Sequence, residues 1–93
     1  MTLLHLYVAG NTASSRRAQQ NILRLREIMK EPHCEVRVID VLVEPQLAEE
    51  AGILATPTLS YEHPLRPRRI VGDLGESKRI LEFLGLEAKD DGL

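Results

Sequence analysis

Side chains that could carry out chemistry are few in this sequence. It has one cysteine, Cys34, and three histidines, His5, His33 and His63, none of which stands at a spacing typical of metal ligands. A single cysteine cannot form the internal disulfide that dithiol exchange requires. No serine, histidine and aspartate occupy a recognisable nucleophile setting, and no glycine-rich phosphate-binding motif is present. The sequence therefore predicts no enzyme activity and no metal or cofactor site.

A hydroxyl-rich segment, Gly10-Asn11-Thr12-Ala13-Ser14-Ser15, follows the first apolar run of the chain. Its hydroxyls can cap the next helix or, together with free backbone N–H groups, bind an anion at the helix N-terminus. Capping is the commoner role of such residues. Serine oxygens have no accessible reversible redox step, so the segment cannot replace a pair of thiols.

Arginines form two local groups in a chain whose net charge is −2. Arg16 and Arg17 open the first predicted helix, and Arg66, Arg68 and Arg69 lie in and after a predicted hairpin turn. Because arginine pairs well with carboxylates, both groups are candidate protein-binding surfaces, and the alternative is a solvated face. The acidic balance argues against nucleic-acid binding. No stretch is long and apolar enough for a membrane span, and residues 1–5 lack the basic region of a signal peptide, so we expect a cytoplasmic protein.

The first half of the sequence alternates between strand and helix patterns. Residues 3–9 are nearly all apolar, as expected of a central strand. The helix that follows carries an apolar stripe at Ala18, Ile22, Leu25 and Met29, widened by Leu23 and Ile28. Residues 34–41 form the next strand. Its charged residues, Glu35 and Arg37, share one face and predict an edge of the sheet.

The second half begins with a short helix over residues 45–51, which ends at Gly52. A Thr56-Pro57 pair then interrupts an apolar run. Because proline cannot donate to a sheet ladder, the pair predicts a loop that enters a strand at Thr58. The remaining predicted elements are a hairpin with strands over 58–62 and 68–71, and a last helix that ends at Gly85.

This order of elements, βαβαββα, is that of a thioredoxin-like α/β domain, which we expect over residues 1–86. In that fold a cis proline precedes the third strand, so we predict a cis Thr56–Pro57 bond. Thioredoxin-like oxidoreductases carry Cys-x-x-Cys after the first strand, where this chain has the sulfur-free residues 10–15. Residues 87–93 have little apolar content and are expected to form a flexible acidic tail.

Five blocks of the sequence point to a known family. They are Leu6-Tyr7-Val8-Ala9-Gly10-Asn11-Thr12, Val38-Ile39-Asp40-Val41-Leu42, Pro45-Gln46-Leu47-Ala48-Glu49-Glu50, Ile53-Leu54-Ala55-Thr56-Pro57-Thr58-Leu59 and Arg68-Arg69-Ile70-Val71-Gly72-Asp73-Leu74. In this order they resemble the KaiB family of clock proteins over about residues 3–86. The resemblance implies a non-enzymatic protein that binds the N-terminal ATPase ring of phosphorylated KaiC. In the cyanobacterial clock, KaiB-like proteins then sequester KaiA and engage output histidine kinases.

KaiB-like proteins also exchange between two folds. One is a thioredoxin-like monomer that binds KaiC, and the other is a βαββααβ-type ground state with a rearranged second half, which assembles into tetramers or dimers. A small core suits two packings of similar free energy. We expect the hinge of this change at Gly52, Thr56, Pro57, Pro64, Pro67, Gly72, Asp73 and Gly85. The resemblance places KaiC binding at Arg16, Arg17 and Arg37.

Departures from the cyanobacterial pattern fall in the segment expected to rearrange. Gly52 stands where those proteins usually have lysine, the turn over 64–67 is altered, and Phe83 and Gly85 replace glycine and aspartate. They indicate a relative from outside the cyanobacteria that works with KaiC alone, so KaiA binding is not implied. Two alternatives stay open: a KaiB-like sensor domain of an output histidine kinase, and a thioredoxin-fold redox or glutathione-binding protein.

Overall fold

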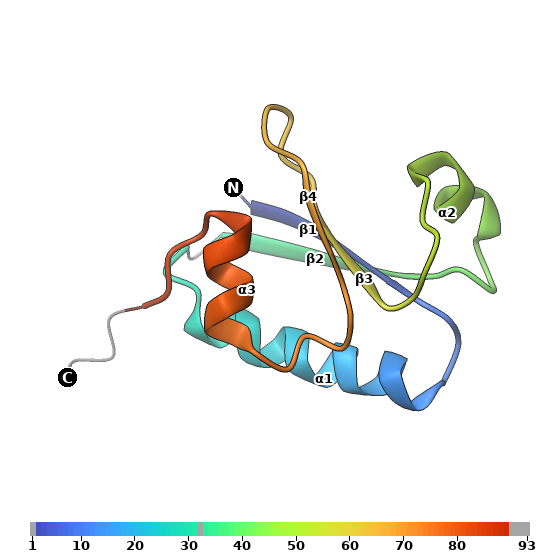
Figure 1. The fold of residues 1–93 in the computed structure, drawn as a ribbon, viewed down its shortest axis with the longest axis horizontal. Coiled ribbons are helices and arrows are strands. Elements are labelled where there is room, and N and C mark those ends of the chain that lie inside the picture. Colours follow the sequence, from blue (N-terminus) through green and yellow to red (C-terminus); the bar gives the residue numbers. More distant parts are fainter. Residues whose placement is uncertain (1, 32, 90–93) are drawn as a thin grey trace.

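The computed structural model describes residues 2–31 and 33–89, which form a mixed sheet and three helices (Figure 1). In chain order the elements are β1 (Thr2–Val8), α1 (Ala13–Ile28), β2 (Cys34–Asp40), α2 (Pro45–Ala51), β3 (Thr58–Tyr61), β4 (Arg68–Val71) and α3 (Ser77–Leu84). The order βαβαββα and the thioredoxin-like α/β fold are thereby confirmed.

The sheet has the strand order β2-β1-β3-β4. β1 pairs in parallel with β2 and antiparallel with β3, and β3 pairs antiparallel with β4. The α1 crossover explains the parallel pair, since parallel neighbours need a long connection. β2 lies at one edge, as its charged face predicted, and β4 lies at the other.

The two faces of the sheet are covered unequally. Leu4, Leu6 and Val8 of β1 belong to the main core, which α1 and α3 complete from one side. Tyr7 points to the opposite face and joins a small second cluster with Ile39 and Ala48 of α2. Figure 1 shows α1 and α3 on one side of the strands, with α2 set off at one end on the other side. Much of that second face is therefore left without a covering helix.

The predicted stripe of α1 is buried at all four main positions, Ala18, Ile22, Leu25 and Met29. The prediction that Leu23 widens the stripe is wrong, because its side chain is 58% exposed. Leu23 lies beside Val36 and Val38 along the outer edge of β2, where no further strand covers it. Among the described helices, none is long and apolar enough to cross a membrane.

Backbone geometry in the second half agrees with the local predictions. The Thr56–Pro57 peptide bond is cis. Gly52 and Gly85 adopt the left-handed conformation at the C-termini of α2 and α3, with φ of 70° and 75°. A residue without Cβ takes up this conformation at little cost, which explains why both helices end at glycine.

Part of the segment expected to form the tail is held against the end of α1. Ala88 forms a β-bridge with Met29, and the backbone N–H of Lys30 donates to the carbonyl of Glu87 at 2.9 Å. The Lys30 Nζ also lies 3.2 Å from a Glu87 carboxylate oxygen. These contacts fix residues 87–89 in place. Residues 90–93 of the expected tail lie outside the described residues.

Candidate protein-binding surface

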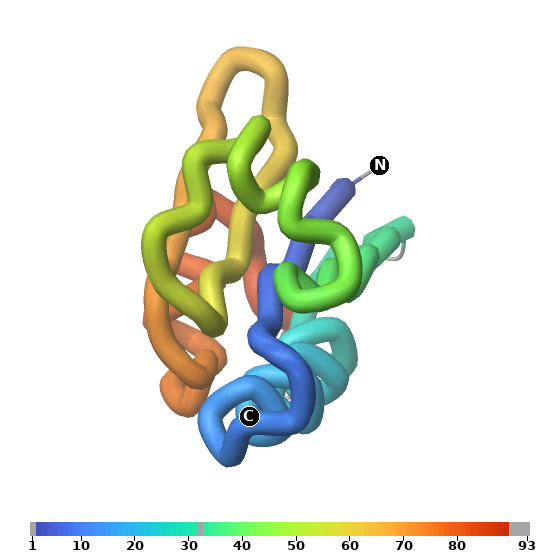
Figure 2. Tube along the Cα trace, turned by 90° about the vertical axis from the view of Figure 1, so that its right-hand side faces the viewer, coloured from blue at the N-terminus to red at the C-terminus, as the bar shows by residue number. Residues whose placement is uncertain are grey.

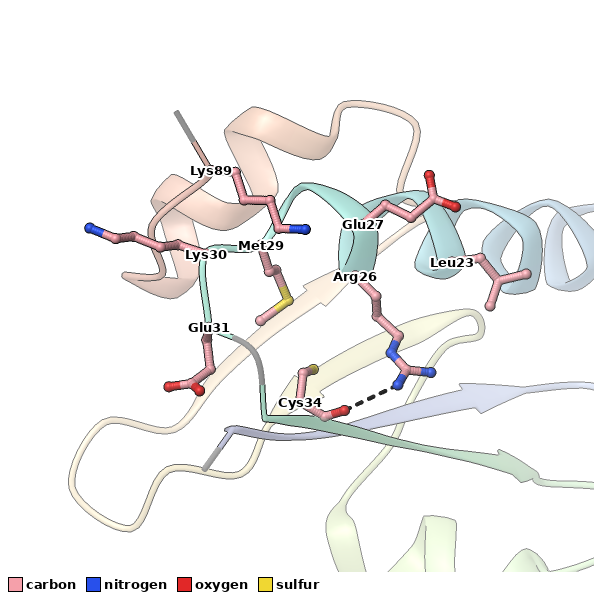
Figure 3. Close-up of a pocket in the computed structure, with 8 residues that line it drawn as sticks. All are labelled: Leu23, Arg26, Glu27, Met29, Lys30, Glu31, Cys34 and Lys89. Atoms are coloured by element: carbon pink, nitrogen blue, oxygen red, sulfur yellow. Dashed lines mark hydrogen bonds between the residues drawn. The ribbon is translucent and has the colours of Figure 1, made fainter. Parts of the chain in front are cut away.

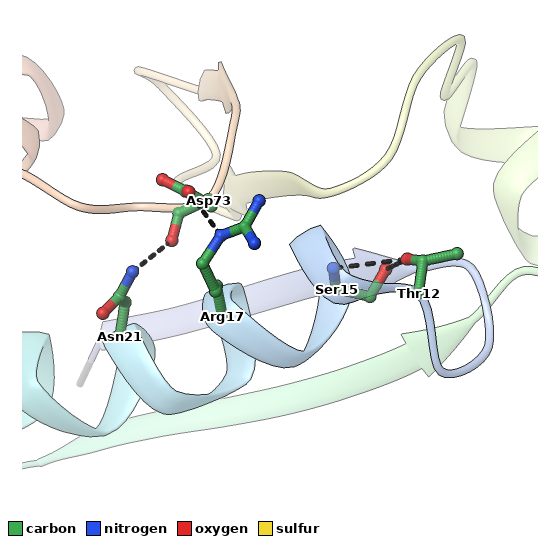
Figure 4. Close-up of polar contacts among 5 residues, drawn as sticks. All are labelled: Thr12, Ser15, Arg17, Asn21 and Asp73. Carbon is green, nitrogen blue, oxygen red and sulfur yellow. Dashed lines mark hydrogen bonds and ion pairs between the residues drawn. The ribbon is translucent and has the colours of Figure 1, made fainter.

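The segment between β1 and α1 is a cap built from side-chain hydroxyls. Thr12 is the N-cap residue, and its Oγ1 accepts from the backbone N–H of Ser15 at 3.3 Å. The same hydroxyl donates to Ser15 Oγ at 2.8 Å, and Ser15 Oγ accepts from the N–H of Ala9 at 3.1 Å (Figure 4 shows the Thr12–Ser15 pair). These bonds give the Thr12 hydroxyl the predicted capping role, and the Ser15 hydroxyl ties the cap to the end of β1.

Asp40 fixes the neighbouring turn from the end of β2. Its Oδ1 accepts from the N–H groups of Gly10 and Leu42, both at 3.0 Å. Gly10 has a φ of 57°, and a Cβ at that position would lie only 2.9 Å from Leu42 Cδ1. The left-handed conformation favours glycine here, whereas the exposed Leu42 side chain can shift away from an added Cβ. The turn that carries a redox motif in thioredoxins is here sulfur-free, and its hydrogen bonds connect the start of α1 to the ends of β1 and β2.

Replacing Ser15 with alanine is expected to lower the free energy of unfolding by about 1–3 kcal/mol, because the fully buried Ser15 hydroxyl is removed and the part-buried N–H of Ala9 loses its acceptor. Urea unfolding followed by circular dichroism measures the change. Ser14→Ala is the matched control, since Ser14 lies on the same turn and its side chain makes no hydrogen bond among the described residues. Equal losses for the two variants would contradict the assigned role of Ser15.

Arg16 and Arg17 both extend from the first turn of α1 and are exposed. Arg16 Nη1 donates to the carbonyl of Asn11 at 2.6 Å. Arg17 Nε donates to Asp73 Oδ2 at 3.0 Å, with both side chains roughly half exposed (Figure 4). The predicted partner-binding residue Arg17 is therefore paired with Asp73, one of the predicted hinge residues.

A second bond joins the same two segments. Asn21 Nδ2 donates to the backbone carbonyl of Asp73 at 2.6 Å, one turn along α1 from Arg17 (Figure 4). The residue after Asp73, Leu74, is 3% exposed in the main core and has a φ of 66°. A leucine adopts this φ at an energetic cost, so surrounding contacts must hold it there. Neither Asn21 nor Leu74 could be recognised from the sequence, since neither residue type indicates such a role.

The third predicted partner-binding residue, Arg37, lies elsewhere. It stands opposite His5 in the β1–β2 register, on the face turned away from α1. Its Nη2 lies 3.5 Å from a Glu44 carboxylate oxygen. Arg16 and Arg17 therefore share one side of the molecule, whereas Arg37 belongs to the other.

The remaining predicted hinge residues are spread over several turns. Thr56 and Pro57 precede β3, Pro64 and Pro67 lie in the β3–β4 connection, and Gly72 follows β4 with a φ of 137°. Together with Gly52 and Gly85, Gly72 gives the second half three glycines with positive φ among the described residues. The structure does not bring the eight residues into one cluster.

Apolar side chains are exposed around α2. Leu42 and Val43 follow β2 and are 70% and 72% exposed, and Leu54, after α2, is 99% exposed. Figure 2 shows α2 and its flanking loops at the front of the molecule, standing clear of the helices on the other face. Exposed apolar side chains beside a helix that contributes only to a small core cluster are typical of a protein-binding surface.

The face of the sheet beside α2 carries a small polar cluster. The Ser60 hydroxyl donates to Glu62, whose other carboxylate oxygen lies 3.5 Å from His5 Nδ1. Burial raises the pKa of Tyr7, and the nearby charge of Glu62 raises it further. No group of three or more potential metal ligands occurs among the described residues.

Cys34 lies at the start of β2, at the end of the sheet opposite to residues 10–15, as predicted. It lines a cavity of about 590 Å³ with residues of the α1 C-terminus and Lys89 (Figure 3). Arg26 Nη2 donates to the carbonyl of Cys34 at 3.2 Å. Burial raises the pKa of the Cys34 thiol, and the nearby Arg26 only partly offsets this effect.

We expect Cys34 to react with iodoacetamide more slowly in the folded protein than in urea, because a raised pKa leaves less of the reactive thiolate. The neutral thiol is favoured in the fold. The preference for the neutral thiol therefore stabilises the folded state fully at pH values below the ordinary thiol pKa. This stabilisation is lost as the pH rises through the raised pKa of Cys34. Alkylation rates between pH 7 and 9, followed by mass spectrometry, test this expectation. Faster reaction in the folded state would contradict it.

Comparison with known proteins identifies the family. Residues 5–86 match the family model described as the KaiB domain. The chain is 49% identical over 84 residues to a circadian clock oscillator protein KaiB of Synechococcus elongatus, covering 90% of this chain and 82% of that protein. A protein of the same description from Nostoc punctiforme is 50% identical over 84 residues, covering 90% of this chain and 81% of that protein.

Solved structures show the same fold at low sequence identity. The N-terminal domain of Synechococcus elongatus SasA superimposes with a TM-score of 0.71 at 21% identity, covering 99% of this chain and 88% of that one. Mitochondrial thioredoxin 3 of Saccharomyces cerevisiae superimposes with a TM-score of 0.72 at 18% identity, covering 90% of this chain and 76% of that one. The fold is therefore shared with thioredoxins, whereas the sequence, matched over most of its length, shows that this chain belongs to the KaiB family.

Proposed function

We propose that this chain is a KaiB-like timing regulator, which binds the N-terminal ring of a KaiC-like ATPase and modulates its phosphorylation and ATPase cycle. The observation that carries the proposal is the match of residues 5–86 to the KaiB domain, with 48–50% identity to clock oscillator proteins. The residues present support action by protein–protein contact. The chain has one cysteine, and the hydroxyls of Thr12 and Ser15 are engaged in capping.

The surface that we assign to the ATPase is centred on the N-terminal turn of α1. Arg16 and Arg17 are exposed there, and arginine is well suited to pairing with carboxylates on a partner. We keep Arg37 as a further contact, made from the other side of the sheet. A partner that engages Arg17 competes with Asp73 for the same guanidinium, so binding is linked to the loop after β4.

We propose that binding accompanies a change of fold in the second half. Gly52, Thr56, Pro57, Pro64, Pro67, Gly72, Asp73 and Gly85 would form the hinge of this change. Two packings of one chain coexist when their free energies differ by only a few kcal/mol, about 1–5. The contacts of Arg17 and Asn21 with Asp73 belong to the thioredoxin-like arrangement and would stabilise it selectively.

We also propose an oligomeric state, a second partner and a cellular location for this chain. The ground state would be a homo-oligomer, a tetramer or a dimer, and an output histidine kinase would be a second partner. KaiA is not included, because the sequence departs from the cyanobacterial pattern in the segment that rearranges. We place the protein in the cytoplasm.

The test is the phosphorylation and ATP hydrolysis of the intact KaiC-like hexamer of the same organism. Adding this chain in molar excess over the hexamer is expected to change the rate of at least one of the two. Arg17→Ala should reduce that change. An unaltered phosphorylation course and an unaltered hydrolysis rate at saturating protein would contradict the proposal.

A redox function is the rival from a different class, since the fold is that of thioredoxins. It predicts disulfide reduction that depends on Cys34. Comparing the wild type with Cys34→Ser in an insulin-reduction assay distinguishes the redox function from the proposed timing function. We expect no activity in either protein, because the lone thiol has no resolving partner.

A further inference from the structure

The proposed function leaves the second arginine group, Arg66, Arg68 and Arg69, without a role. One of the three, Arg69, lines a groove of about 330 Å³ between β4 and α3, and Arg68 lies over Phe83 of the same groove. The groove is lined by Arg69, Ile70, Glu76, Arg79, Ile80 and Phe83. Phe83 is 54% exposed, which is unusual for the only phenylalanine of a small chain. An aromatic ring beside an apolar groove offers a site for a partner's side chain.

The backbone next to the groove is free to accept another strand. β4 lies at the edge of the sheet and pairs only with β3. An edge strand presents unpaired N–H and C=O groups on its outer side, where an extended peptide can add by main-chain hydrogen bonds. No further strand of the described residues pairs with this edge, and the turn that precedes β4 projects from the molecule (Figure 2, yellow to orange).

The charges around the groove are predominantly positive. Arg66, Arg68 and Arg69 are exposed, and none forms an ion pair with a carboxylate among residues 2–31 and 33–89. The carboxylate that lines the groove, Glu76, is paired with Arg79 at 2.9 Å. The Arg68 guanidinium lies 5.9 Å from the centre of the Phe83 ring, a cation–π contact that holds the charge beside the apolar surface.

We propose that an extended, acidic segment of a partner protein adds to β4 as a fifth strand of this sheet. Its carboxylates would pair with Arg66, Arg68 and Arg69, and one of its apolar side chains would enter the groove against Ile70 and Phe83. The choice of an acidic occupant rests on charge complementarity, since three unpaired guanidinium groups repel a basic segment. The choice of an extended segment rests on the free edge of β4.

This surface is separate from the one assigned to the ATPase. It is formed by β4 and α3, whereas Arg16 and Arg17 extend from the first turn of α1. The inference therefore goes beyond the proposed function, and each can fail while the other holds.

The probe is a blocked hexapeptide of alternating glutamate and valine, labelled with fluorescein and titrated with the full chain at low ionic strength. We expect saturable binding that weakens with added salt. Arg69→Glu is expected to weaken binding by about 10- to 100-fold, because it reverses a charge that pairs with the peptide. Phe83→Ala should weaken it several-fold. The matched control, Arg24→Glu, reverses an exposed arginine of α1 and should leave the affinity unchanged.

Two further peptides test the mode of binding with the unmodified protein. A lysine–valine peptide should not bind, and a glutamate–valine peptide methylated on alternate backbone nitrogens should lose binding, because it cannot complete the strand pairing. Equal binding of either peptide would overturn the proposal. So would an absence of saturable binding, an equal loss with Arg24→Glu, or self-association through the groove, detected as a dimer that Arg69→Glu dissociates.

Discussion

Replacing Leu81 with alanine is expected to lower the free energy of unfolding by about 3–4 kcal/mol. Leu81 is 1% exposed and belongs to the core cluster that joins α3 to α1 and the sheet. A domain of this size has about 5–15 kcal/mol of stability in total, so the loss is a large part of it. Urea unfolding followed by circular dichroism gives the value.

Two comparison variants make the result specific to this packing. Leu25→Ala truncates an equally buried leucine of α1 and should cost a similar amount. Phe83→Ala, two residues after Leu81 on α3, removes a half-exposed side chain and should cost much less. If Leu25→Ala is strongly destabilising while Leu81→Ala is not, then α3 does not dock in solution as described, and a rearranged second half is the populated state.

Reversing the charge of Arg17 is expected to weaken binding to the KaiC-like ATPase by about 100-fold, as is typical when a charged group at an interface loses its partner. The new carboxylate would also face Asp73, whose Oδ2 lies 3.0 Å from Arg17 Nε in the free protein. Arg17→Glu would thus remove the proposed contact to the ATPase and introduce repulsion toward the loop after β4. Isothermal titration against the intact hexamer measures the affinity.

The control for Arg17→Glu is Arg24→Glu, two turns further along α1 and also exposed. Both variants change the net charge equally, so a general electrostatic effect would weaken both. We expect Arg24→Glu to bind within a few-fold of the wild type. Wild-type affinity for Arg17→Glu would remove Arg17 from the interface while leaving the family assignment intact.

Local features of the fold could be predicted from the sequence because local chemistry determines them. Apolar spacing identified the buried stripe of α1, and the charges of Glu35 and Arg37 identified an edge strand. Gly52 and Gly85 identified the ends of α2 and α3. In each case the residue type restricts the backbone or the burial directly, so no distant contact is needed to make the prediction.

Features that depend on distant segments could not be predicted. Arg17 and Asp73 are 56 positions apart, and nothing in either residue type indicates that they pair. The exposure of Leu23 depends on where the sheet ends, and the placement of residues 87–89 depends on backbone groups at the end of α1. The left-handed conformation of Leu74 has no sequence indication, since leucine seldom adopts it.

The most direct measurement is the binding of the unmodified chain to the intact KaiC-like hexamer in a phosphomimetic form, followed by size-exclusion chromatography with light scattering. A KaiB-like regulator is expected to co-elute as a complex whose mass exceeds that of the hexamer by several copies of the 10.5 kDa chain. Separate elution of the two proteins, with both phosphomimetic and unphosphorylated hexamers, would contradict the central claim that this protein acts by docking onto the ATPase.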